Sequence, residues 1–144
     1  MNILVSACLL GVRCRYNGGG VLDPGIVKLM KEHHLIPVCP EIMGGLATPR
    51  TPAERVGGQV RTRDGADVTD AYERGAKEAL RLARLYDCHA AILKERSPSC
   101  GSGRIYDGTF TGVLTHGDGV CAACLKEHGI KVYGESQIER LLER

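Results

Sequence analysis

Four short apolar runs are spaced along the chain, at residues 2–7, 35–38, 89–93 and 130–133. Such brief, nearly continuous apolar runs are typical of strands buried in a parallel sheet. Helical patterns lie between and after them, over about 24–34, 69–86, 118–128 and 135–144. Strands that alternate with helices predict an α/β fold. We expect a Rossmann-like three-layer domain with a mainly parallel four-stranded sheet.

Local signals set some of the expected boundaries. Asp23 followed by proline is typical of a helix N-cap. We expect Asp67 or Thr69 to cap the second helix and Asp118 to cap the third. Residues 56–62 are predicted to form a hairpin arm.

Length and composition narrow the class of protein. The chain has 144 residues, which predicts one domain over residues 1–144. A net charge of +2 with interspersed charges and few aromatic residues does not favour a nucleic-acid surface. No apolar run approaches the ~18 residues of a membrane helix. The first residues lack the features of a signal peptide, so we expect a cytoplasmic location.

Seven cysteines then need an explanation other than disulfides, which a reducing compartment disfavours. Cys8, Cys39 and Cys100 each follow one of the predicted strands. Parallel strands place their carboxyl ends on one edge of the sheet, where ligands bind, so we expect these three thiols to converge. Three thiolates can hold an iron–sulfur cluster or a zinc ion. Inert burial is the alternative.

The remaining cysteines are weaker candidates. Cys14 is either a fourth ligand or a plain loop thiol, and Cys88 precedes a strand, which favours burial. Cys121 and Cys124 form a C-x-x-C pair that resembles a redox motif. The pair lies inside a predicted helix, however, where two thiols on one face favour core packing.

Polar residues near the same predicted edge are candidates for catalysis and binding. Glu41, directly after Cys39 and a proline, is either a general acid or base or a loop carboxylate paired with Arg50 or Arg55. Arg50, on a stiff loop, suits an anion or a carbonyl group.

The loop after the third strand carries further candidates. Lys94, Ser97 and Ser99 are all close enough in sequence to Cys100 to reach the site. The serines have no visible His and Asp partners, so they do not indicate a catalytic triad.

The cysteine motifs carry a resemblance that covers nearly the whole chain. The matching stretches are VSACLLG at 5–11, CRYNG at 14–18, PVCPE at 37–41, GGL at 44–46, TPR at 48–50, GADVT at 65–69, ILK at 92–94, SPSCG at 97–101 and YDG at 106–108. Together they resemble a small bacterial family that includes the thiouracil and thiouridine desulfidases (TudS-like proteins).

The resemblance implies a [4Fe-4S] cluster held by only three cysteines, which in this chain are Cys8, Cys39 and Cys100. The fourth iron would be free to bind the sulfur of a thiolated pyrimidine and act as a Lewis acid. Sulfide would leave as hydrosulfide without net electron transfer.

The polar residues near the predicted edge take hypothetical roles in such a mechanism. Glu41 would activate water for attack at the carbon that carries sulfur. Ser97 or Ser99, with Lys94, would position the ring or stabilise its charge. We expect Arg50 and Tyr16 to contact the substrate.

The expected partner is a small thiolated pyrimidine rather than a membrane. The weak basic excess makes a thiouridine of tRNA the less favoured substrate, and the chain is expected to be a monomer or a homodimer. Two other functions stay open. One is a metal- or cluster-binding sensor or sulfur carrier without catalysis, and the other is a thiol oxidoreductase that uses Cys121 and Cys124.

Overall fold

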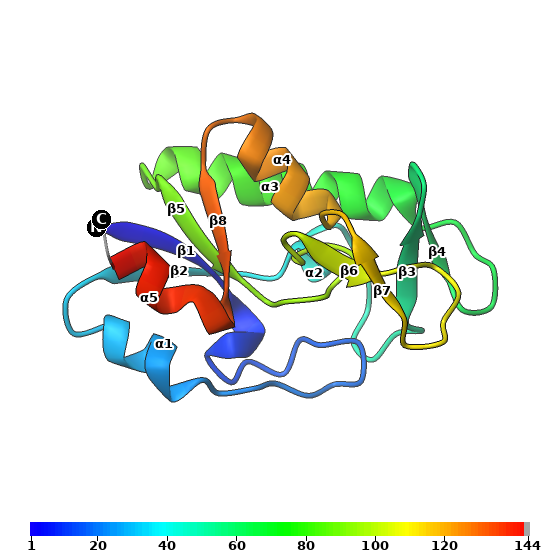
Figure 1. The fold of residues 1–144 in the computed structure, drawn as a ribbon, viewed down its shortest axis with the longest axis horizontal. Coiled ribbons are helices and arrows are strands. Elements are labelled where there is room, and N and C mark those ends of the chain that lie inside the picture. Colours follow the sequence, from blue (N-terminus) through cyan, green and yellow to red (C-terminus); the bar gives the residue numbers. More distant parts are fainter. Residues whose placement is uncertain (143–144) are drawn as a thin grey trace.

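The fold is built on one parallel sheet, seen in the computed structural model, which describes residues 1–142 (Figure 1). Its strands are β1 (Asn2–Ser6), β2 (His34–Val38), β5 (Ala90–Leu93) and β8 (Lys131–Gly134). They are ordered β2-β1-β5-β8, and every neighbouring pair is parallel. The structure therefore confirms the predicted sheet, with strand ends shifted by a residue.

The helices of the two outer layers are α1 (Pro24–Leu29), α3 (Thr69–Leu85), α4 (Val120–Glu127) and α5 (Ile138–Leu142). Successive side chains of a strand point to opposite faces of the sheet, so β1 contributes side chains to the core on both faces. Leu4 packs in the core under α3 and α4, whereas Ile3 and Val5 pack under α1 and α5. This confirms the three-layer arrangement (Figure 1).

Some helix ends differ from the predictions. Asp23 caps α1 as expected, since its carboxylate accepts the backbone N–H groups of Gly25 and Ile26. That α-helix ends at Leu29, earlier than predicted, and a few hydrogen-bonded turns continue to residue 33. The predicted helix over 135–144 is a 3-10 turn, η2 (Glu135–Gln137), followed by α5, and residues 143–144 lie outside the described part.

Two predicted caps are wrong. The N-cap of α3 is Val68, because the Asp67 carboxylate instead accepts the N–H and hydroxyl of Thr69. The N-cap of α4 is Gly119, because Asp118 instead accepts hydrogen bonds from other partners.

Two hairpins lie beyond the carboxyl ends of the sheet (Figure 1). β3 (Ala53–Val56) and β4 (Gln59–Thr62) form the first, which confirms the predicted arm. β6 (Arg104–Tyr106) and β7 (Leu114–His116) form the second, which the sequence did not predict. No helix within residues 1–142 has both the length and the apolar character needed to cross a membrane.

Candidate active site

A cavity of about 420 Å³ lies at the carboxyl edge of the sheet. Cys8, Cys14, Cys39 and Cys100 line it together. Cys8 lies in η1 (Ala7–Leu9), the turn directly after β1. Cys39 is the N-cap of α2 (Pro40–Met43), directly after β2, and Cys100 lies in the loop after β5. The strand ends thus bring the three predicted thiols to one cavity, with Cys14 beside them.

Three of the cavity cysteines, Cys8, Cys14 and Cys100, are weaker acids than an exposed thiol. Burial raises the pKa of Cys8 to about 11. Burial and the neighbouring Cys39 thiol raise the pKa of Cys14 to about 12. Burial and then the nearby Cys121 hold the pKa of Cys100 well above its usual value, although a hydrogen bond from Ser6 acts in the opposite direction. These thiols carry protons at neutral pH, so the binding of a metal centre would have to displace those protons.

The set of donors fits an iron–sulfur cluster. Within residues 1–142, no three His, Cys, Asp or Glu side chains are grouped so that they could hold a single metal ion. A cluster is larger than one ion and takes thiolate ligands on separate iron atoms. Cys8, Cys39 and Cys100 come from three different strand ends around one cavity, which suits a group of that size.

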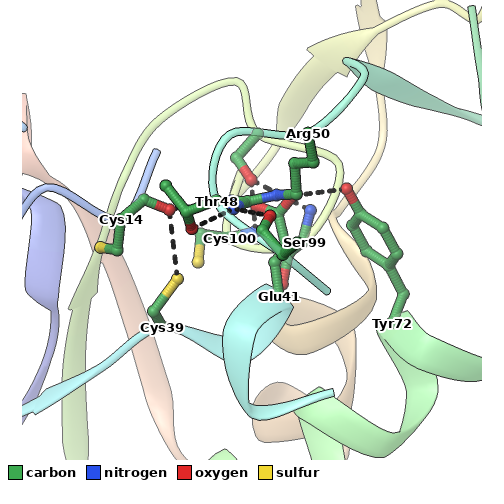
Figure 2. Close-up of polar contacts among 10 residues, drawn as sticks. Cys14, Cys39, Glu41, Thr48, Arg50, Tyr72, Ser99 and Cys100 are labelled. Carbon is green, nitrogen blue, oxygen red and sulfur yellow. Dashed lines mark hydrogen bonds and ion pairs between the residues drawn. The ribbon is translucent and has the colours of Figure 1, made fainter. Parts of the chain in front are cut away.

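A partly buried polar network lies beside the thiols, centred on Glu41 (Figure 2). The Tyr72 hydroxyl donates to Glu41 Oε1 at 2.5 Å. Arg50 Nε donates to the same oxygen at 3.3 Å and forms an ion pair with it. Both donors bind one oxygen, so they fix the orientation of the carboxylate. Burial and then the Glu41 charge raise the pKa of Tyr72, which therefore stays a hydrogen-bond donor.

Two glycines bring Glu41 to Tyr72. A Cβ atom on Gly75 of α3 would lie 1.7 Å from the Pro40 carbonyl oxygen of α2. A Cβ atom on Gly44, the C-cap of α2, would lie 1.9 Å from the Ala71 carbonyl oxygen of α3. Only glycine at both positions allows the two helices to approach this closely.

Arg50 is held by more than Glu41. Its Nη1 donates to the Ala47 carbonyl oxygen and the Thr48 hydroxyl, and its Nη2 donates to the Cys14 carbonyl oxygen at 2.9 Å. The same Cys14 carbonyl accepts the Cys39 thiol at 3.7 Å. The guanidinium thus ties the cysteine side of the cavity to the Glu41 side (Figure 2).

Of the other predicted residues, Ser97 and Lys94 line the cavity, and Ser99 is buried behind it. Ser97 lines the cavity, and its hydroxyl oxygen accepts the backbone N–H groups of Ser99 and Cys100. Ser99 is fully buried, and its hydroxyl has no hydrogen-bond partner in the described chain. Lys94 lines the cavity and pairs with Glu135 at 2.8 Å.

Tyr16 lines the cavity, and its side chain is exposed. Its carbonyl oxygen accepts the backbone N–H of Arg50 at 2.8 Å, which joins the loop after η1 to the loop after α2.

Sequence reasoning missed several residues of the site, among them Tyr72, Glu54 and Phe110. Tyr72 lies on the buried face of α3 that also carries Ala76 and Ala79, so its position in that pattern was a signal of a buried hydroxyl. Glu54 and Phe110 line the cavity from the two hairpins. Nothing in the local sequence indicated them.

The other cysteines lie outside the cavity wall. Cys88 is buried in the core, as the prediction for it stated. Cys121 is fully buried within α4, and burial followed by the Cys124 thiol raises its pKa. A buried thiol that is a weak acid is a poor nucleophile, so the geometry does not favour redox chemistry there.

Comparison with known proteins gives concordant matches. The model of a family described as 2-thiouracil desulfurase matches residues 3–137. An uncharacterized protein of Bacillus subtilis (strain 168), YbbK, is 45% identical over 150 residues, covering 97% of this chain and 99% of that protein. A solved structure of the [4Fe-4S]-dependent thiouracil desulfidase TudS is 48% identical, with a TM-score of 0.93, covering 98% of this chain and 95% of that one.

Proposed function

We propose, since this chain belongs to the 2-thiouracil desulfurase family, that it is a [4Fe-4S]-dependent enzyme that desulfurates a thiolated pyrimidine. Water would supply the oxygen of the product, and the sulfur would leave as hydrosulfide. The observation that carries the proposal is the convergence of Cys8, Cys39 and Cys100 with Glu41 in one cavity. The similarity to TudS supports both the cofactor and the substrate class.

Cys8, Cys39 and Cys100 would hold the cluster. When bound, it would supply a Lewis-acidic iron for the sulfur of the substrate. Cys14 would act through its backbone, because its carbonyl oxygen anchors both the Arg50 guanidinium and the Cys39 thiol.

Glu41 is the proposed base. Tyr72 and Arg50 both bind its Oε1, and no hydrogen bond within residues 1–142 uses its Oε2. Oε2 is therefore the atom that would take a proton from the attacking water. Because Oε1 is held from two directions, the carboxylate needs no reorientation before the proton moves.

Ser97 is the proposed hydrogen-bond donor to the substrate. Its oxygen already accepts two backbone N–H groups, which leaves the hydroxyl hydrogen for another acceptor. Because Ser97 lines the cavity, that acceptor would be on the pyrimidine. Buried Ser99 is the weaker candidate of the two. Lys94 would contribute a positive charge that Glu135 partly balances.

Anaerobic reconstitution followed by a sulfide-release assay with 2-thiouracil tests the proposal. We expect visible cluster absorbance, iron and acid-labile sulfide, and release of hydrosulfide together with uracil. Cys100→Ser should lose the absorbance and the activity, whereas Cys124→Ser, outside the cavity, should keep both. Absence of cluster absorbance would disprove the proposed cofactor. A complete cluster without sulfide release would favour a sensor or a carrier.

A further inference from the structure

One wall of the cavity is aromatic, and the proposed chemistry does not use it. Phe110 is the single phenylalanine of the chain, and it lines the cavity from the loop that joins β6 to β7, residues 107–113. Its side chain is partly exposed rather than buried in the core. An apolar ring kept at the surface of a cavity points to contact with a ligand.

The loop holds Phe110 in an unfavourable backbone conformation. Its φ angle is +59°, in the left-handed region that bulky residues rarely adopt. Such a conformation persists only where the surroundings fix it, and it is found most often at ligand sites. Residues 107 and 113 close the loop through a backbone hydrogen bond of 3.0 Å.

Glu54 of β3 supplies the constraint. Its Oε1 accepts the backbone N–H of Gly108 at 2.9 Å and that of Phe110 at 3.1 Å. The loop also lies directly against β3, because a Cβ atom on Gly108 would approach Val56 Cγ2 to 2.6 Å. A nearly buried carboxylate thus sets the position of the aromatic residue from across the site.

The ring is also oriented by a cation. The Arg63 guanidinium lies over the Phe110 ring, with its Cζ atom 5.7 Å from the centroid. One face of the ring therefore packs against Arg63, and the ring and the cation line the cavity together.

We propose that Phe110 is the surface on which the substrate ring stacks, and that Glu54 is the positioning residue that holds it there. The inference rests on the proposed function and names the property that the site selects: a planar heteroaromatic ring that bears the thiocarbonyl. Acyclic thiocarbonyl compounds such as thiourea have no ring to stack, so they would gain nothing from Phe110.

Calorimetric titration of the reconstituted protein with uracil, the product that does not turn over, tests this without relying on activity. Wild type and Phe110→Tyr should bind alike. Phe110→Leu should bind roughly 5- to 150-fold more weakly, the equivalent of about 1–3 kcal/mol of stacking per base. Thiourea should bind equally to all of them.

Phe110→Gly separates function from folding. Glycine removes the ring and also relieves the strain of the left-handed backbone conformation. The thermal midpoint of the variant should therefore not fall, whereas its affinity for uracil should. Glu54→Ala should weaken uracil binding with the ring still present, and Glu54→Gln should restore it, because the amide oxygen can accept both N–H groups.

Two results would overturn the inference: wild-type protein that does not bind uracil, or Phe110→Leu that binds it as tightly as wild type. Neither result decides the proposed function, which depends on sulfide release from 2-thiouracil by the wild-type enzyme. Conversely, weaker binding in the Leu and Gly variants would support the stacking surface even if no sulfide were released.

Discussion

The close approach of α2 to α3 makes Gly75→Ala a sharp test of how Glu41 is positioned. The new methyl group would begin 1.7 Å from the Pro40 carbonyl oxygen, a contact that must open to at least 3.0 Å. The helices would therefore separate by about 1.3 Å. The Tyr72–Glu41 hydrogen bond spans the same two helices at 2.5 Å and would break.

The expected effects on activity and on stability differ in size. Misplacement of a catalytic group by about 1 Å lowers the rate by about 100-fold, so we expect a loss of that order in sulfide release. Overpacking costs about 1–3 kcal/mol, whereas alanine in place of glycine within a helix recovers about 1 kcal/mol. The net loss, up to about 2 kcal/mol, is smaller than the ~5–15 kcal/mol that holds a typical domain together.

Sulfide release and urea unfolding, measured on the same preparations, check both numbers. Gly58→Ala is the matched control, because a Cβ atom there meets nothing within 4 Å, and it should leave the turnover unchanged. If Gly75→Ala turned over 2-thiouracil at the wild-type rate, the α2–α3 contact would not be what positions Glu41. A loss of turnover caused by unfolding would instead show in the urea midpoint.

Three further outcomes are expected. Tyr72→Phe removes one of the two donors to Glu41, so kcat should fall by about tenfold while KM stays nearly unchanged. Steady-state measurement of sulfide release checks this, and a change in KM alone would contradict a positioning role. Cys124→Ala should keep full turnover in the same assay, whereas a dithiol mechanism would require that thiol. Partial burial raises the pKa of Asp118, but hydrogen bonds, chiefly from Lys126, outweigh it and lower the pKa overall. The ionised carboxylate therefore stabilises the fold above the unfolded pKa of about 3.9, and this contribution is lost as the pH falls through the folded value. Urea unfolding should show Asp118→Asn to be less stable than wild type at pH 7, with a difference that shrinks toward pH 3; a constant difference would refute this origin.

The sheet was predictable because burial leaves a direct mark on the sequence. Both faces of β5 (Ala90–Leu93) are covered, so all four of its residues are apolar. The buried side of α3 consists largely of small residues, as predicted. Ala76 and Ala79 pack in the core with the sheet, and Gly75 lies against α2. Parallel strands then bring their carboxyl ends to one edge, so the convergence of three cysteines followed from topology alone.

The second hairpin left no comparable mark. β6 and β7 have only three residues each, too few for an alternating pattern to stand out. The two caps predicted wrongly have a related cause. The Asp118 carboxylate is used by Gly103, 15 residues earlier in the chain, and a cap signal cannot reveal such a distant competitor.

The pairing of Glu41 with Arg50 was one of the alternatives that the sequence offered, but the other polar partners across the site were invisible in it. Tyr72 meets Glu41 from 31 residues away, and Glu54 meets the loop of Phe110 from 54 and 56 residues away. Residue type and local spacing identified Glu41 as a carboxylate near the cysteines. Only the packing of α2 on α3 shows which of its oxygens is already held.

The hydrogen bonds of the site reduce the number of groups that are left for chemistry. The Arg50 guanidinium is used by four acceptors, so it positions its neighbours and keeps one N–H group on Nη2 for a ligand. Lys94 is paired with Glu135, which leaves its charge as the contribution it can make. Of Glu41 and Ser97, the first keeps its Oε2 as an acceptor and the second keeps its hydroxyl hydrogen as a donor. Both groups are fixed by neighbours that are themselves held, which is what a preorganised hydrolytic site requires.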